Sequence, residues 1–95
     1  MISVIFPAFN EEKNVVELHT RLVSAMKKTG EEFEIIAIDD ASTDNTVKVL
    51  STLKTIKIIK LSYNAGQSAA LDAGIHNAKG EIVVIIDGDL QNDPS

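Results

Sequence analysis

The sequence has no cysteine, no tryptophan and only two prolines among its 95 residues. Without cysteine, the chain has no disulfide framework, no thiol nucleophile and no cysteine-based zinc site. Its longest uninterrupted apolar run, Ile82–Ile86, is far shorter than the roughly 20 residues that a membrane-spanning helix needs. These absences favour a globular domain in a reducing compartment, and we expect a cytoplasmic location.

Positive charge is also scarce. The chain carries 14 acidic residues against 9 lysines and arginines, for a formal net charge of -5, and the basic residues are scattered along it. A nucleic-acid surface would instead concentrate Lys and Arg to neutralise phosphates. The composition therefore argues against a nucleic-acid partner.

Apolar and β-branched runs alternate with segments of helical periodicity. The runs that predict strands are 2–6, 34–39, 56–61 and 81–87, and the segments between them predict three helices. The second and fourth runs are almost continuously apolar, which is typical of strands covered on both faces of a parallel sheet. We therefore expect one α/β domain over residues 1–95, ordered β-α-β-α-β-α-β, with a parallel sheet of about four strands and helices on both faces.

Two of the helices carry local signals. In the first, the apolar side chains recur at spacings of three and four residues, namely Val15, Leu18, Leu22 and Met26. We expect Asn10 to cap its start and Gly30 to follow its end. The last helix, at about 67–78, is rich in alanine and glycine, so we expect it to lie close to the sheet.

Polar residues follow each predicted strand, at the sheet edge where open α/β folds bind their ligands. Five carboxylates meet there, namely Asp39, Asp40, Asp44, Asp87 and Asp89. In an extended backbone, Asp87, Asp89 and Gln91 would point the same way. Three oxygen ligands on one side suit Mg²⁺ or Mn²⁺. Gly88, between the two aspartates, keeps the backbone open for the close approach of a ligand.

Several nucleotide-binding motifs are absent. The chain has neither G-x-x-x-x-G-K-[ST] nor G-x-G-x-x-G, so a Walker-type ATPase and a dinucleotide-dependent dehydrogenase lose their main support. Two other interpretations remain open at this point. One is a phosphohydrolase of the haloacid dehalogenase type with Asp87 as nucleophile, and the other is a non-enzymatic phospho-acceptor receiver domain that uses Asp39, Asp40 and Asp87.

Four motifs in order give the sequence a specific resemblance. They lie at 4–12 (VIFPAFNEE), 38–44 (IDDASTD), 61–66 (LSYNAG) and 86–94 (IDGDLQNDP). This series resembles the family 2 glycosyltransferases, and most of all their branch of dolichol-phosphate and polyprenyl-phosphate sugar transferases. The resemblance covers essentially the whole chain.

The resemblance implies a Rossmann-like GT-A fold whose N-terminal part binds a UDP- or GDP-linked sugar. By this carry-over, the residues that bind the nucleotide sugar are Pro7, Phe9, Glu11, Asp39, Asp40, Asp87 and Gly88. The implied ligands of the divalent ion are Asp87, Asp89 and Gln91. The implied reaction is inverting, metal-dependent sugar transfer to an acceptor, for which polyprenyl phosphate is a candidate.

The resemblance places the acceptor site and the catalytic residues beyond Ser95. We therefore expect an incomplete domain that is inactive by itself and is held at the cytoplasmic face of a membrane through other regions. An exposed sheet edge is expected to permit self-association.

The chain departs from the family pattern at two positions. Ala41 stands where relatives often have glycine, and a positive φ there would cost alanine about 1–2 kcal/mol. Gln67 stands where a lysine is common, which leaves one fewer cation for a diphosphate.

Overall fold

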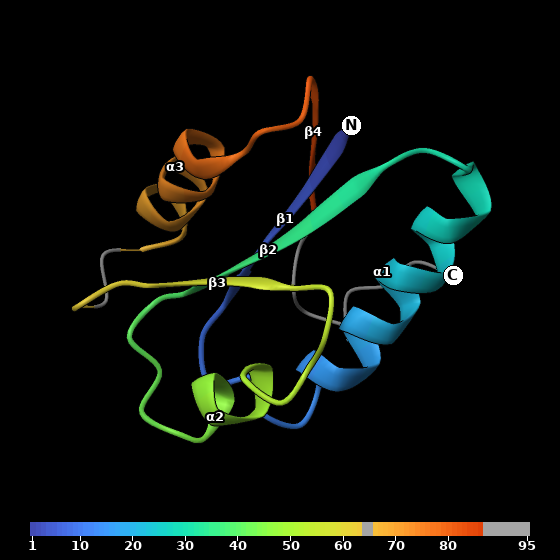
Figure 1. Ribbon diagram of the computed structural model, residues 1–95. Helices are drawn as coiled ribbons and strands as arrows, with labels where there is room; N and C mark the ends of the chain where they lie inside the picture. The colour runs from blue at the N-terminus through green and yellow to red at the C-terminus, as the bar shows by residue number, and fades with distance from the viewer. Residues whose placement is uncertain (64–65, 87–95) are drawn as a thin grey trace.

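The computed structural model describes residues 1–63 and 66–86, which form a parallel four-stranded sheet with helices (Figure 1). The strands are β1 (Ile2–Ala8), β2 (Phe33–Asp39), β3 (Lys57–Lys60) and β4 (Ile82–Ile85). The helices are α1 (Val15–Thr29), α2 (Thr46–Leu50) and α3 (Gln67–Asn77). This alternation confirms the predicted α/β class and the predicted order of elements.

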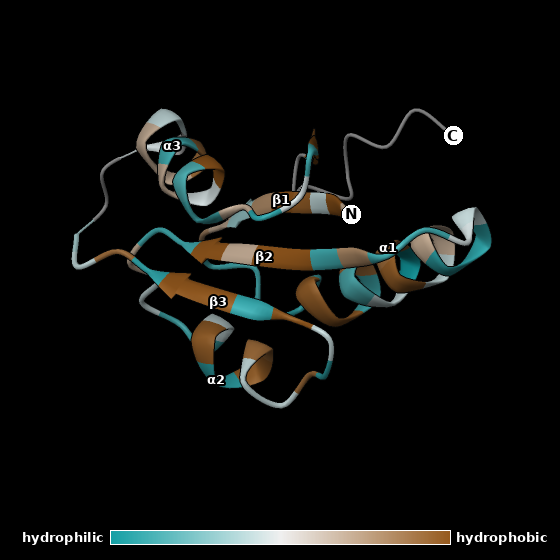
Figure 2. Cartoon of the chain, turned by 45° about the horizontal axis from the view of Figure 1, so that its top comes forward, coloured by the Kyte–Doolittle hydropathy of each residue, from teal (hydrophilic) through white to brown (hydrophobic). Residues whose placement is uncertain are grey.

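The strand order is β3-β2-β1-β4. The chain thus steps outward from β1 to β2 and β3, and then returns to the other side of β1 to form β4. Helices α1 and α2 cover one face of the sheet and α3 covers the other (Figures 1 and 2). Open α/β sheets bind ligands at the carboxyl ends of the strands where the strand order reverses, which here lies between β1 and β4.

Alternate residues of the central strands point to opposite faces, as the two-residue period of a strand requires. On one face, Val4 and Phe6 of β1 pack in a core cluster with Leu18 of α1. On the other face, Ile5 and Ile36 share a smaller cluster with α3. Strand β2 is hydrophobic over most of its length (Figure 2), as expected for a strand that is covered on both faces.

Helix α3 approaches the sheet closely because its contact residues are small. Ala70 is fully buried in this interface. A Cβ atom added at Gly74 would stand 2.5 Å from Cγ2 of Ile5 and 2.7 Å from Cδ1 of Ile38, which is too short for a real contact. The predicted close approach is therefore confirmed, and only glycine fits at position 74 without displacing neighbouring side chains.

The backbone of β1 serves both of its neighbours. The N–H of Asp40 donates to the carbonyl of Ala8 on the β2 side at 2.9 Å, and the N–H of Ile86 donates to the carbonyl of Ile5 on the β4 side at 2.8 Å. Pro7, two residues beyond Ile5, has no N–H to offer β4. Among the described residues, the register between β1 and β4 runs from Ile2 to Ile5, whereas the pairing with β2 continues to Ala8.

Strand β4 forms an edge of the sheet, and its four side chains are exposed. The expected exposed edge is therefore present. The pairing of two copies through this edge stays a prediction. In the part of the chain that the structure describes, no helix is both long enough and apolar enough to cross a membrane.

The start of α1 differs from the sequence prediction. The helix begins at Val15, and its cap residue is Asn14, whose side chain makes no capping hydrogen bond. The prediction that Asn10 caps this helix was wrong, because the side chain of Asn10 bonds to the loop after β2 instead. The end of the helix is as predicted, with Gly30 in the left-handed conformation at φ +74°.

Candidate functional site

The candidate site lies at the carboxyl ends of β1 and β2, where two loops meet. Pro7 and Phe9 come from the end of β1 and the loop after it, and Asp39 and Asp40 come from the end of β2. Asp39 pairs with Ala8 in the sheet register, so the two strand ends are adjacent. Phe9, the residue after Ala8, is 43% exposed, which leaves a large apolar side chain partly open to solvent at this edge of the sheet.

Asp39 is buried, with only 3% of its surface exposed. One carboxylate oxygen, Oδ2, accepts a hydrogen bond from the N–H of Ser42 at 3.1 Å. The other, Oδ1, is buried and has no hydrogen-bond partner among the described residues. A buried carboxylate oxygen without a donor is costly, so Asp39 is suited to accept a hydrogen bond from a ligand.

Asp40 is also buried, and it connects β2 to the start of α3. Its Oδ2 accepts a hydrogen bond at 3.2 Å from the N–H of Gly66, the residue at the cap position of α3. Gly66 has a φ of +92°, a conformation that glycine adopts freely. Asp40 thus holds Gly66, and with it the start of α3, near the end of β2.

Asn10 joins the two loops of the site, a role that the sequence analysis missed. Its Oδ1 accepts from the N–H of Thr43 at 2.8 Å and from the N–H of Asp44 at 3.3 Å, and its own N–H donates to Oγ of Ser42 at 2.9 Å. Asn10 has a φ of +52°, which asparagine tolerates better than most residues. The available signal was an asparagine in a loop, where it is as typical of a turn as of a helix cap.

Asp44 is used by the fold itself. Its Oδ1 accepts hydrogen bonds from the N–H and the hydroxyl of Thr46, and its Oδ2 accepts from the N–H of Glu12 at 3.5 Å. Desolvation raises the pKa of Asp44, but the hydrogen bonds from Thr46 and Glu12 outweigh it, so the pKa is lowered from its ordinary value of 3.8. Asp44 is therefore a structural carboxylate, with few acceptor sites left for a ligand.

Glu11 lies at the base of the same junction. Its N–H donates to Oγ1 of the buried Thr46 at 2.9 Å, and its Oε2 accepts from Nδ2 of Asn14 at 3.0 Å. The backbone of Glu11 is thus held by α2, and its carboxylate is directed to the start of α1.

The residues predicted to bind a metal, Asp87, Asp89 and Gln91, lie outside the described residues, as does Gly88. Within residues 1–63 and 66–86, no group of three or more His, Asp or Glu side chains could hold a metal ion. Of the five carboxylates that were predicted to lie together, the structure describes only Asp39, Asp40 and Asp44. Asp44 already accepts hydrogen bonds from Thr46.

Residues 3–95 match the family model described as Glycosyl transferase family 2. The chain belongs to this family. Membership sets aside the haloacid dehalogenase and receiver-domain interpretations, and it confirms the resemblance on which the site residues were carried over.

Two curated relatives carry polyprenyl phosphate in their names. The chain is 38% identical to the undecaprenyl-phosphate 4-deoxy-4-formamido-L-arabinose transferase of Proteus mirabilis, over 98% of this chain and 30% of that protein. It is 40% identical to the dodecaprenyl-phosphate galacturonate synthase of Rhizobium johnstonii, over 98% of this chain and 29% of that protein. The chain therefore spans about 30% of the length of these relatives.

Solved structures of glycosyltransferases share the fold. Residues 1–349 of S. aureus TarS, solved in complex with UDP-GlcNAc, superpose with a TM-score of 0.81 and 33% identity, covering 93% of this chain and 26% of that one. The Pyrobaculum calidifontis mannosyltransferase PcManGT, solved with GDP-Man and Mn²⁺, gives a TM-score of 0.77 and 28% identity, covering 93% and 27%. These neighbours confirm the predicted GT-A architecture.

Proposed function

We propose that residues 1–95 are the nucleotide-sugar-binding part of a glycosyltransferase that uses a UDP- or GDP-linked donor. The observation that carries this proposal is the buried Oδ1 of Asp39, which has no hydrogen-bond partner among the described residues and lies at the carboxyl edge of the sheet. Uracil and guanine both present ring N–H donors, and ribose presents hydroxyl donors. Any of these donors could form a hydrogen bond to the carboxylate oxygen and offset part of the free-energy cost of its desolvation.

The other described residues of the site would complete a nucleoside pocket. Phe9 is partly exposed and offers a ring on which a base can stack. Pro7 precedes it at the end of β1, and Glu11 follows it in the loop. Asp40 accepts a hydrogen bond from the N–H of Gly66 and so holds the start of α3 near the end of β2. The bonds of Asn10 and Asp44 to the facing loops keep the pocket walls in place before a ligand binds.

We propose that Asp87 and Asp89, with Gln91, hold Mg²⁺ or Mn²⁺ against the donor diphosphate, and that Gly88 lets the diphosphate approach. Support comes from their oxygen donors, which suit a hard cation, and from the Mn²⁺ bound by PcManGT. A divalent ion held there would supply charge stabilisation to the departing nucleoside diphosphate.

For the whole protein we propose inverting transfer of the sugar to a polyprenyl phosphate at a membrane surface. The names of the curated relatives support this acceptor. An acceptor phosphate is already ionised at neutral pH, so it needs little help from a general base. Because the chain spans about 30% of those relatives, we propose that these 95 residues bind the donor without transferring the sugar.

The test is a thermal-shift titration of the chain with UDP and with GDP, in the presence and absence of Mn²⁺. We expect a nucleoside diphosphate to raise the melting temperature as RT ln(1 + [L]/Kd), more strongly with Mn²⁺. Asp39→Asn should weaken binding about tenfold or more, as expected for losing a hydrogen bond to a charged acceptor. Asp72→Asn, an exposed acid on α3, is the matched control and should bind like the unchanged chain. Equal binding by the Asp39→Asn variant would refute the assigned role of this carboxylate.

A further inference from the structure

A second hollow lies away from the donor site, between α1 and the segment that leads into β3. It is a depression broadly open to solvent, with a volume of about 490 Å³. Its polar lining comes from one side of α1 and from the residues just before β3, namely His19, Thr20, Ser24, Lys27, Lys54 and Thr55. We call it the α1 cavity.

The α1 cavity and the candidate donor site lie toward opposite ends of the sheet. Lys54 and Thr55 precede Lys57, the first residue of β3, so they belong to the amino end of that strand. Asp39 is the last residue of β2 and pairs with Lys60, the last residue of β3. A ligand in the α1 cavity would therefore not share the pocket of the nucleotide.

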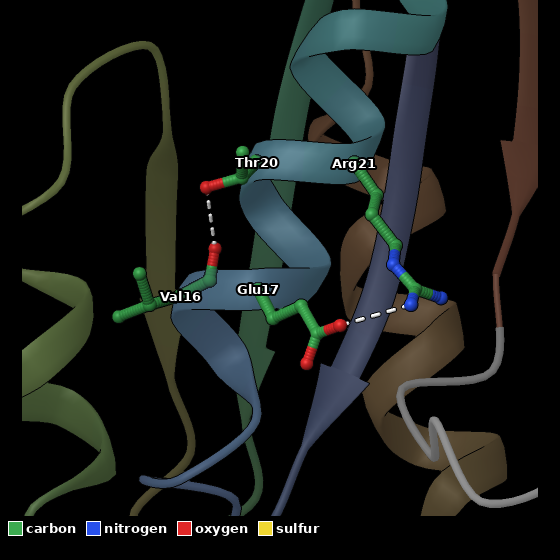
Figure 3. Close-up of polar contacts among 4 residues, drawn as sticks. All are labelled: Val16, Glu17, Thr20 and Arg21. Atoms are coloured by element: carbon green, nitrogen blue, oxygen red, sulfur yellow. Dashed lines mark hydrogen bonds and ion pairs between the residues drawn. The ribbon is translucent and has the colours of Figure 1, made fainter.

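The charge around the α1 cavity is positive, although the chain as a whole is acidic. Neither Lys27 nor Lys54 has a carboxylate within 4.0 Å among the described residues. The acidic residue of α1, Glu17, is paired with Arg21 at 2.9 Å. Figure 3 shows that this pair projects from a different side of the helix than Thr20, which lines the cavity. Two lysines thus line the cavity, and among the described residues neither has a carboxylate within 4.0 Å to neutralise it.

The wall of the cavity is held in a fixed shape. His19 is only 7% exposed, and its Nε2 lies 3.2 Å from the carbonyl oxygen of Thr55. Because a carbonyl oxygen only accepts, Nε2 must carry the proton in this bond. Thr55 has a φ of +60°, which is unusual for a β-branched residue and persists only where surrounding contacts hold it. The segment before β3 is therefore anchored to α1 before any ligand arrives.

Hydroxyl groups complement the two cations. Thr20 donates its hydroxyl proton to the carbonyl of Val16 at 2.8 Å (Figure 3), so its oxygen retains only acceptor capacity. Ser24 has no hydrogen-bond partner among the described residues, so its hydroxyl is available as a donor. Two ammonium groups and one hydroxyl donor match the acceptor oxygens of a phosphate group.

We propose that the α1 cavity binds a phosphate monoester or diester, with Lys27, Lys54 and Ser24 as the donors to its phosphate. The volume exceeds what a bare phosphate ion fills, so an organic phosphate is the expected class of ligand. The same chemistry occurs in free organic phosphates and in the headgroups of anionic phospholipids, and the experiment separates these two sources.

The first experiment titrates ¹⁵N-labelled protein with glycerol 3-phosphate and follows amide chemical shifts. We expect saturable chemical-shift changes at Ser24, Lys27 and Thr55. The Asp39→Asn variant should show the same changes, so this result does not depend on whether the proposed donor site is correct. The double variant Lys27→Gln/Lys54→Gln should bind glycerol 3-phosphate at least about tenfold more weakly, because it loses two charge-assisted hydrogen bonds.

A matched control is Lys28→Gln/Lys48→Gln, which removes the same charge from exposed positions outside the cavity. The second experiment measures co-sedimentation with phosphatidylglycerol vesicles and with phosphatidylcholine vesicles. Binding of glycerol 3-phosphate assigns a free phosphate, and binding only to phosphatidylglycerol vesicles assigns a lipid headgroup. The proposal is overturned if neither probe binds, or if the control variant loses as much binding as the cavity variant.

Discussion

Asp39 and Asp44 lie at the two ends of one short segment between β2 and α2, yet the structure treats them in opposite ways. Asp44 is surrounded by donors from its own chain, and both of its oxygens accept hydrogen bonds. Asp39 is more deeply buried, and one of its oxygens accepts none among the described residues. The same type of side chain is thus fully hydrogen-bonded at one end of the segment and only half hydrogen-bonded, among the described residues, at the other.

This difference supports the proposed role of Asp39 as a ligand-binding acid without reference to relatives. A buried polar atom that the fold leaves unpaired raises the free energy of the folded chain, and such atoms are rare in native structures. They cluster where a ligand repays the cost, because a binding site must keep its donors or acceptors free. We therefore expect replacement of Asp44 to lower the free energy of unfolding, and replacement of Asp39 to leave it nearly unchanged or raise it.

The largest expected effect is on stability at Asp44. Asp44→Ala removes the acceptor for the N–H and the hydroxyl of Thr46, which is fully buried, and should lower the free energy of unfolding by about 2 kcal/mol. Asp39→Asn removes a buried charge that has a hydrogen-bond donor at only one of its two oxygens among the described residues, so it should leave the free energy of unfolding within about 1 kcal/mol of its original value or raise it. Urea denaturation measures the free energy of unfolding of both variants. A larger decrease for Asp39→Asn than for Asp44→Ala would contradict the proposed difference between the two acids.

A smaller part of the Asp44 effect should depend on pH. Its pKa in the folded chain is below the ordinary 3.8, because hydrogen bonds from Thr46 and Glu12 to the ionised carboxylate outweigh desolvation. The ionised group therefore stabilises the fold above about pH 4, and this contribution is lost as the pH falls through the folded-state pKa. We expect Asp44→Asn to flatten the acid side of the stability profile, measured by thermal unfolding from neutral pH downward. An unchanged acid slope in that variant would assign the effect to other carboxylates.

The smallest effect is expected between the two acids, at Ala41. The structure gives Ala41 a φ of +58°, which confirms that this position uses the left-handed conformation anticipated from the family pattern. Ala41→Gly should relieve the steric cost and raise the free energy of unfolding by about 1 kcal/mol, after the greater entropy of unfolded glycine is subtracted. Ala69→Gly, on an exposed position of α3, should instead lower it. Equal losses in both variants would show that Ala41 is not strained.

Much of this fold was accessible from the sequence. Apolar runs and helical spacings predicted every described element, since these patterns reflect which side chains each element must bury. The position of Asp39 and Asp40 at the carboxyl edge followed from the parallel order, because such strands end on one side of the sheet. The misassigned cap at Asn10 has a physical cause. Its side chain could satisfy backbone donors of either the nearby helix or a loop about thirty residues away, and local sequence does not distinguish them.

The sequence alone thus determined the α/β class, the strand-end acids and the family, because all three depend on residue types at local spacings. Only the tertiary structure distinguished the paired Asp44 from the partly unpaired Asp39, since each carboxylate finds its donors through chain folding. The same holds for the α1 cavity, whose two lysines are 27 positions apart in the sequence and face one hollow only because α1 packs beside the entry to β3.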